Sequence, residues 1–379
     1  MKKIAVLSAI LSLFIGTGWA FGADLTPIET LGRKLFFDDN LSANKTMSCA
    51  TCHAPEVGFT GPDDYINLMT AVYPGAIGDR FGNRKPPSAA YAGDSPILFD
   101  DNGTWTGGMF WDGRATGWIL GDPIAEQAQG PFLNPLEQAL PNAATVCKRV
   151  SDSDYSDLYM MVFNEPVDYT DDIEGTYENI ARAIAAYERS PEVNPFSSKY
   201  DYYLKGKAKL SKIEKKGLKL FEGKGMCSNC HPSSMKKNGE LPLFTDFTYD
   251  NLGVPKNPNN PFYNMPPKWN PDGADWIDPG LGGFLTDPQE WGKHKVPTLR
   301  NVDKRPYPEF VKAYVHNGVF KSLGEVVHFY NTRDVKDWPE PEVAENVNTD
   351  ELGDLGLTPD EEEAIVAFLK TLSDGFDPN

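Results

Sequence analysis

The chain has few basic residues, few cysteines and no second long apolar run, and each shortage excludes a class of protein. Its 36 Lys and Arg against 54 Asp and Glu give a net charge of -18. This charge repels phosphates and argues against nucleic acid as the main partner. No apolar run after the N-terminus reaches the roughly 18 residues of a membrane span. Five cysteines in 379 residues exclude a small disulfide-held fold.

Strand patterns are sparse as well, whereas 34 glycines and 31 prolines predict long structured loops. The length leaves room for two domains. We therefore predict a mainly α fold with extensive loops.

The N-terminus has the pattern of an export signal. Lys2 and Lys3 precede an apolar stretch over 4–15, and small residues follow it. This pattern predicts a signal peptide over 1–20, cut after Ala20 or alternatively after Ala23, and export to the periplasm. A buried N-terminal helix is the alternative interpretation.

Four of the five cysteines fall into two C-x-x-C-H runs, which are the attachment signature of haem c. In each run two thiols can add to the vinyl groups of a haem, and the following imidazole can reach its iron. A four-cysteine zinc site and redox dithiols or disulfides are alternatives that need no histidine there. The fifth cysteine, Cys147, is expected to be a free thiol. The sequence thus predicts two covalently bound haem c groups, attached by Cys49, Cys52, Cys227 and Cys230 and ligated by His53 and His231.

The surroundings of the two runs are alike. An amphipathic segment precedes each run and a second helical segment closes each half, which is the small cytochrome c pattern and indicates an internal duplication. We predict tandem cytochrome c-like domains over 24–189 and 205–379, joined by a linker at 190–204. The expected helices cover 27–37, 177–188, 211–221 and 358–372, with Ser211 and Thr358 as N-caps.

Further segments resemble the bacterial dihaem cytochrome c peroxidase and MauG superfamily. The resemblance implies a periplasmic enzyme that reduces hydrogen peroxide with electrons from a small redox protein such as a cytochrome c or cupredoxin. It implies that the first haem is the reaction site and the second the electron relay, and it is compatible with a homodimer. The acidic surface favours a donor with a basic patch. The matching segments are FWDGR (110–114), EQAQGP (126–131), NPLE (134–137), VPTLRNV (296–302) and VHNG (315–318).

The resemblance also assigns roles to single residues. Glu137 and Gln127 would stand over the open face of the first haem beside Pro131, and Trp111 would carry electrons between the haems. A carboxylate over the iron can move the proton that cleavage of the O–O bond requires. The alternatives are a surface acid for Glu137, a loop-fixing hydrogen bond for Gln127 and a core aromatic for Trp111.

Two positions set this chain apart from peroxidases that need reductive activation. Those proteins carry a histidine in the loop that matches 73–84, where Ile77 stands here, so an accessible first haem is expected. The sixth ligand of the second haem is expected fourteen residues after His316, which is Tyr330 rather than a methionine. Met265 is an alternative ligand, and a core tyrosine is the other interpretation of Tyr330.

The helix expected to carry Tyr330 begins at a Ser322 cap, and His328 points off its apolar face. The family also binds Ca²⁺ through an Asn whose position is held here by Lys85, and 303–314 carries an insertion. The sequence therefore leaves open whether this chain binds Ca²⁺ or whether the charge of Lys85 replaces that of the ion.

Two other functions stay open. MauG-like oxidation of a protein substrate is favoured by Tyr330. A non-enzymatic dihaem electron carrier is the other, but the loop without histidine and the presence of Glu137 argue against it.

Overall fold

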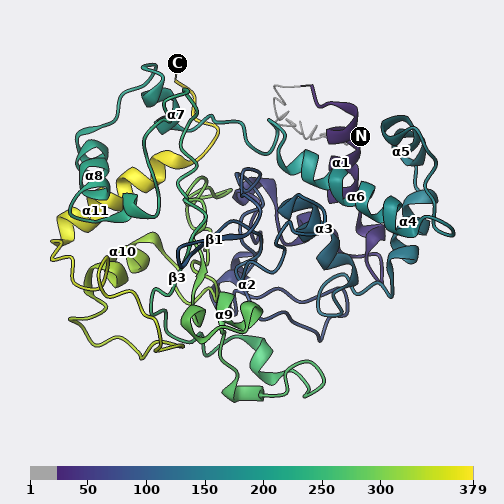
Figure 1. Cartoon of the computed structure of the whole chain (residues 1–379). Coiled ribbons are helices and arrows are strands. Elements are labelled where there is room, and N and C mark those ends of the chain that lie inside the picture. The colour runs from purple at the N-terminus through teal and green to yellow at the C-terminus, as the bar shows by residue number, and fades with distance from the viewer. Residues whose placement is uncertain (1–23, 379) are drawn as a thin grey trace, which may run out of the picture.

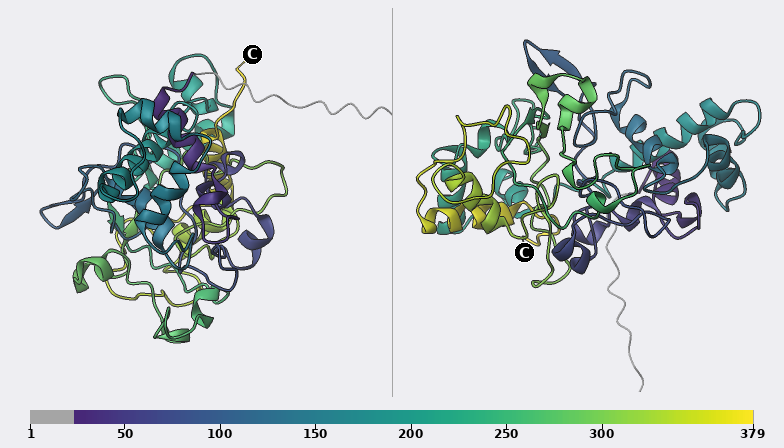
Figure 2. Two further views of the ribbon diagram at one scale, coloured as in Figure 1. Left: turned by 90° about the vertical axis from the view of Figure 1, so that its right-hand side faces the viewer. Right: turned by 90° about the horizontal axis from the view of Figure 1, so that it is seen from below.

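A computed structural model describes residues 24–378, so the predicted signal peptide and its cleavage sites lie outside the described residues. Helices gather at two ends of the molecule, and loops with short strands fill the space between them (Figures 1 and 2). The first end holds α1 (Pro27–Phe36), α3 (Pro123–Leu133), α4 (Ala143–Ser151), α5 (Ser156–Phe163) and α6 (Ile173–Glu188). The second end holds α7 (Lys199–Leu204), α8 (Lys212–Glu222), α10 (Leu323–Thr332) and α11 (Pro359–Leu369).

Sheet is limited, within the described part of the chain, to two short antiparallel two-stranded sheets. Phe99 lies opposite Thr106 in the first and Tyr249 opposite Lys295 in the second. The prediction of a mainly helical fold with long loops is confirmed. The remaining elements between the ends are α2 (Asp64–Met69), α9 (Gly280–Leu285), β1 (Phe99–Asp101), β2 (Thr104–Thr106), β3 (Tyr249–Asp250) and β4 (His294–Lys295).

The helix expected before each C-x-x-C-H run crosses the expected closing helix, and both crossings are built in the same way. Gly32 of α1 lies so close to α6 that an added Cβ would be 1.8 Å from the Ala183 carbonyl oxygen. Gly217 of α8 lies equally close to the Ala364 carbonyl oxygen of α11, at 1.8 Å. The two crossings support the internal duplication inferred from the sequence.

Two large hydrophobic clusters surround these crossings. Leu31, Leu35 and Ile184 belong to the first cluster, and Phe221 and Phe368 belong to the second. The predicted free thiol of Cys147 is fully buried in the first cluster, where burial raises its pKa to about 11. At ordinary pH this thiol is therefore protonated and unreactive.

The predicted helix caps are confirmed, with small changes at the boundaries. Ser211 and Thr358 form capping boxes with Glu214 and Glu361 at the starts of α8 and α11, which satisfies backbone amides that lack a helical partner. The closing helix of the first half begins at Ile173, earlier than expected, because Asp172 caps it. The stretch expected to be a linker contains α7, so it is not an open connection.

Replacing Gly217 with Ala is expected to destabilise the protein by about 1–3 kcal/mol, since the new methyl group must push α8 away from α11. Thermal unfolding of the haem-loaded protein measures the effect. Gly324→Ala in α10 is the matched control, because its nearest neighbour would be 3.8 Å away and alanine favours the helix. Equal stability of the two variants would contradict this account of the crossing.

None of the helices in the described part of the chain is long and apolar enough to cross a membrane.

Candidate functional site

The two C-x-x-C-H runs adopt the same local conformation. Each begins with one 3-10 turn, over Cys49–Thr51 and over Cys227–Asn229. In both, the histidine amide donates to the carbonyl of the first cysteine, at 3.0 Å for His53 and 3.0 Å for His231. This turn places both thiols and the imidazole around one compact site, as attachment and ligation of a haem require.

The two imidazoles are held in the tautomer that suits an iron ligand. His53 Nδ1 donates to the Phe59 carbonyl at 3.2 Å, and His231 Nδ1 donates to the Phe244 carbonyl at 2.7 Å. Burial lowers the pKa of His53 to about 4 and also lowers that of His231. Both rings therefore stay neutral and leave Nε2 free for a metal, the arrangement common in metal-ligating histidines.

The backbone that supplies these carbonyls is strained in both halves. Phe59 and Phe244 have positive φ angles of 57° and 55°, which are rare for bulky residues. Strain of this kind persists where the surroundings demand one geometry. The repeated strain therefore agrees with a functional role for both carbonyls.

A shared zinc site for the four cysteines is ruled out by their positions. Cys49 packs against the first hydrophobic cluster and Cys227 against the second. No group of potential ligands in the described residues combines the two pairs. The zinc alternative is therefore wrong, and the donor sets fit two separate haems.

Glu137 lies beside the first run, and its place over the open face of the first haem stays a prediction. Its negative charge contributes, after burial, to raising the pKa of the Cys52 thiol. Burial raises the pKa of Glu137 itself, while Arg114 and a hydrogen bond with Asn134 oppose the rise. A carboxyl group whose pKa is raised in this way can both accept and return a proton.

The loop without histidine packs directly against Glu137. The Ala76 amide donates to the Glu137 carbonyl at 2.7 Å, and Arg80 donates to the Pro135 carbonyl at 3.2 Å. Ile77 follows Ala76 directly in this loop. The structure thus brings together the two features that the sequence linked to an accessible first haem.

Gln127 is less firmly placed. It is half-buried on α3, and its side chain makes no hydrogen bond with other described residues. Pro131 lies in the same helix, and its carbonyl accepts from the Gln138 amide at 3.1 Å. The role of Gln127 at the open face of the first haem therefore stays a prediction.

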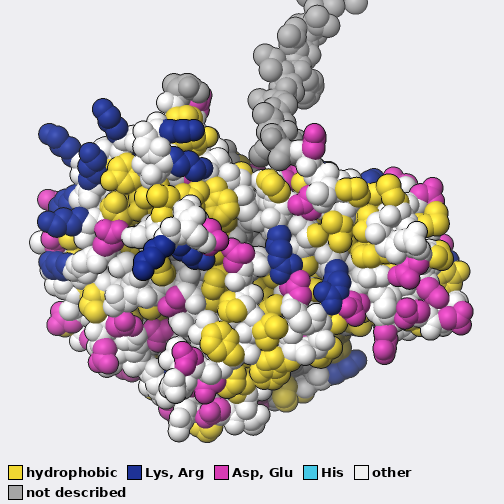
Figure 3. All heavy atoms as spheres, turned by 45° about the horizontal axis from the view of Figure 1, so that its top comes forward, with side chains coloured by type: hydrophobic (Ala, Val, Ile, Leu, Met, Phe, Trp, Pro, Cys, Tyr) yellow, Lys and Arg dark blue, Asp and Glu magenta, His cyan; other side chains and the backbone are white. Residues whose placement is uncertain are grey.

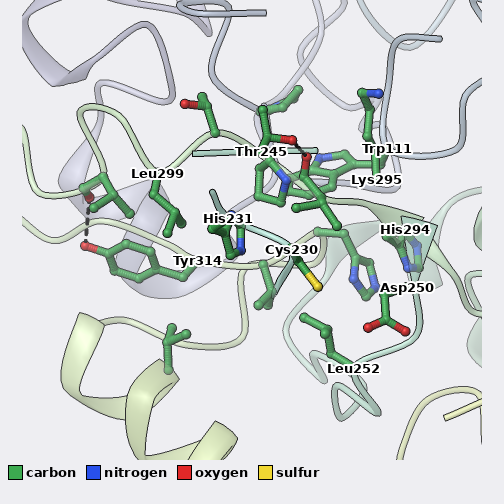
Figure 4. A pocket seen from close by; sticks show the side chains of 18 of the residues that line it. Trp111, Cys230, His231, Thr245, Asp250, Leu252, His294, Lys295, Leu299 and Tyr314 are labelled. Carbon is green, nitrogen blue, oxygen red and sulfur yellow. Dashed lines mark hydrogen bonds between the residues drawn. The ribbon is translucent and has the colours of Figure 1, made fainter. Parts of the chain in front are cut away.

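A cavity opens at the second run and collects residues from both halves of the chain. Figure 4 shows Cys230 and His231 between Trp111 on one side and Tyr314 on the other. Tyr330 lines the same cavity, and the alternative ligand Met265 does not. Of the two candidate sixth ligands, only Tyr330 therefore shares this cavity with His231, and its role as a ligand stays a prediction.

Tyr330 is held by α10, whose predicted cap is confirmed. The Ser322 side chain accepts from the Glu325 amide at 3.1 Å. Burial raises the pKa of Tyr330, and its hydroxyl has no hydrogen-bond partner among the described residues. His328 lies off this face, as predicted, where its ring pairs with Glu362 of α11 at 2.9 Å.

Trp111 is buried and lines the same cavity. Its indole Nε1 donates to the Lys85 carbonyl at 2.9 Å. The positive charge of Lys85 contributes, after burial, to lowering the pKa of His53, which puts Lys85 near the first run. Trp111 therefore lines the second site directly, and Lys85 lies between Trp111 and the first site.

A buried charged network holds Trp111 in place, and sequence reasoning missed it. Arg84 bridges Asp112 and Asp278, both at 2.6 Å. The His316 ring lies edge-on to Trp111 at 6.5 Å and stacks on His294 at 3.6 Å and 5°. The potential ligand atoms of Asp278, His294 and His316 lie within 4.8 Å of one another, so these three buried side chains are also a candidate group for a metal ion. The motif FWDGR and the neighbouring Arg84 were signals that could have suggested the network.

Two half-buried lysines that line the cavity give it positive charge. Lys295 donates to the Gly107 carbonyl at 2.8 Å, and burial lowers its pKa to about 7. Lys85 donates to the Pro86 carbonyl at 2.9 Å, and burial lowers its pKa to about 8. Neither forms an ion pair within the described residues. Cations of this kind suit a cavity that receives the propionates of a haem.

The comparisons with known proteins agree with the site. A family model described as di-haem cytochrome c peroxidase matches residues 27–209. The methylamine utilization protein MauG of Paracoccus denitrificans is 36% identical over 393 residues, which cover 99% of this chain and 96% of that protein. The cytochrome c551 peroxidase of Pseudomonas aeruginosa is 37% identical over 205 residues, or 53% of this chain and 49% of that protein.

The fold is also similar to that of a solved diheme peroxidase. The diheme peroxidase BthA from Burkholderia thailandensis matches with a TM-score of 0.76 and 31% identity, over 93% of this chain and 87% of that chain. The chain is therefore a member of the di-haem cytochrome c peroxidase family and an oxidoreductase of the peroxidase type.

Proposed function

We propose that this protein reduces hydrogen peroxide in the periplasm with electrons from a small redox protein. The site around His53 is the reaction site, and the site around His231 passes electrons to it. The observation that carries this proposal is Glu137, a half-buried carboxyl group beside Cys52 that packs against a loop without histidine.

The residues divide the chemistry among them. When bound, the haem groups supply the iron and the redox capacity. The Glu137 carboxylate accepts the proton from the peroxide oxygen that attacks and returns it to the oxygen that leaves. The Gln127 amide orients the peroxide, and the packed loop 73–84 limits the entry of bulk water. Two electrons and two protons then convert one peroxide into two waters.

Trp111 is the proposed route between the two sites. Its ring adjoins the second cavity and its indole is fixed by Lys85 and the network of Arg84. Electron relay and core packing are compatible, because a relay must be buried and rigid.

Trp111→Phe is therefore expected to slow electron transfer between the sites, while peroxide still reacts at the first. Stopped-flow spectroscopy of the half-reduced protein mixed with peroxide measures both steps. Trp105→Phe on β2 is the control, because Trp105 is a second tryptophan, partly buried, that packs in a separate small cluster. Equal inter-haem rates in the two variants would contradict the route.

We also propose that Lys85 takes the place of the family's calcium ion. Its side chain is half-buried, and the buried amine of a second lysine, Lys312, donates to the Val57 carbonyl at 2.6 Å and the Lys304 carbonyl at 2.9 Å. Burial and the charge of Lys85 lower the pKa of Lys312 well below its ordinary value. The ammonium of Lys85 supplies positive charge in this region, and it repels a divalent cation.

The tandem domains are proposed with the boundaries 24–189 and 205–379. The two hydrophobic clusters support them. Tyr200 of α7 belongs to the second cluster. The C-terminal part of the stretch 190–204 therefore packs on the second domain.

Electron paramagnetic resonance of the resting protein, followed by peroxide without prior reduction, tests the proposed function. A high-spin ferric signal that reacts with peroxide is the expected result. Two low-spin haems inert to peroxide would instead indicate the electron carrier.

MauG-like oxidation of a protein substrate is the second candidate. The 36% identity to MauG over nearly the whole chain and the position of Tyr330 in the second cavity favour it. The two candidates differ in the electron source. Multiple turnovers of peroxide with a reduced cytochrome c or cupredoxin favour the peroxidase, whereas turnover that requires an oxidisable protein favours the MauG-like reaction.

A further inference from the structure

A dense positive patch precedes the second C-x-x-C-H run. Eight lysines and two glutamates in 205–224 give this stretch a net charge of +6. The rest of the chain carries a net charge of -24, which makes the total of -18. All eight lysine side chains are exposed. Figure 3 shows basic side chains gathered at the end of the molecule where α8 lies. The lysine patch consists of Lys205, Lys207, Lys209, Lys212, Lys215, Lys216, Lys219 and Lys224.

Most of this charge is not neutralised by neighbouring acids. Lys224 pairs with Glu361 at 2.8 Å. Glu214, which lies within the patch, is held instead by Lys199 at 2.7 Å. The patch therefore keeps a strong positive field. The lysines that form no ion pair with any described residue are Lys205, Lys207, Lys209, Lys212, Lys215, Lys216 and Lys219.

The patch has the anatomy of a docking surface. α8 buries Gly217 and Phe221, which leaves its opposite side free. Ile213 is 45% exposed among the lysines. An apolar centre with a charged rim is typical of protein interfaces. α8 ends a few residues before Cys227, so a partner on this surface lies next to the second site.

We propose that the lysine patch is the docking surface for an acidic one-electron redox protein that reduces the second site. This inference rests on the proposed electron-relay role of that site. In each encounter the partner loses one electron and this protein gains it. The net negative charge of the whole chain by itself favours a basic donor. Salt, however, screens the interaction between exposed charges that lie more than about 10 Å apart. The local field of the patch therefore steers the encounter.

The test measures reduction of the haem-loaded protein by two reductants of opposite charge. Reduced plant-type ferredoxin is the negatively charged protein reductant, and the methyl viologen radical cation is the positively charged small-molecule reductant. The variant Lys212→Glu/Lys215→Glu/Lys219→Glu is expected to slow reduction by ferredoxin about tenfold or more and to weaken its salt dependence. Reduction by methyl viologen is expected not to slow.

A control variant changes the net charge equally at exposed lysines elsewhere, as Lys148→Glu/Lys268→Glu/Lys336→Glu. It should retain the wild-type rate with ferredoxin. Unchanged Soret and circular dichroism spectra establish that both variants fold. An equal loss in the control, or no loss in the patch variant, overturns the proposal. Because no peroxide is present, this outcome is independent of whether the protein turns peroxide over.

Discussion

Glu137→Gln is expected to lower the rate of the peroxide reaction about 10²-fold or more, which is the usual contribution of a general acid–base group. Glutamine keeps the size and the hydrogen-bonding oxygen of the side chain but cannot accept and return a proton. The resting haem spectra should not change, because Glu137 ligates neither iron. Stopped-flow spectroscopy of the reaction with peroxide measures the rate.

The pH dependence gives a second readout of the same group. Burial raises the pKa of Glu137, and Arg114 only partly opposes it. The carboxylate form accepts the proton, so the wild-type rate should fall as the pH drops through this raised pKa. The Gln variant should lack this fall. Glu178→Gln on α6, a half-exposed partner of Arg182, is the control, and full peroxide turnover by Glu137→Gln would remove the assignment.

The sequence predicted the parts of this site that depend on fixed local spacing. The C-x-x-C-H turns, the Ser211 and Thr358 caps and the placement of Tyr330 on α10 all follow from short-range rules of helix geometry and ligand spacing. Their positions in the structure agree because each is decided within a few residues.

What the sequence could not show depends on contacts between distant segments. Arg84 reaches Asp278 across 194 residues, and His294 of β4 stacks on His316 in a separate loop. The motif FWDGR marks one side of this network, but no periodicity or spacing identifies its distant partners. α7 was missed for a different reason, since Pro and Ser residues around it are typical of a loop, and its helix is set by the Ser198 cap and by packing.

Tyr330→Phe is expected to change the spectrum of the second haem and to raise its reduction potential by on the order of 0.1 V, within the range that axial ligands span. A phenolate oxygen stabilises the ferric state, and phenylalanine offers no ligand. Resonance Raman spectroscopy and a potentiometric titration measure the two effects. Tyr314→Phe is the matched control, because Tyr314 lines the same cavity but donates to the Val302 carbonyl at 3.3 Å.

The ionisation of Tyr330 separates a ligand from a plain core residue. Burial raises its pKa, and the charge of Asp250 acts in the same direction. A phenolate at this position therefore forms at neutral pH only if a cation lies against the oxygen. We expect no phenolate absorption in the haem-free protein and a phenolate-to-iron signal in the loaded protein. Loaded protein without that signal, together with an unchanged potential in Tyr330→Phe, would make Tyr330 a core residue and leave the second haem without a ligand from α10.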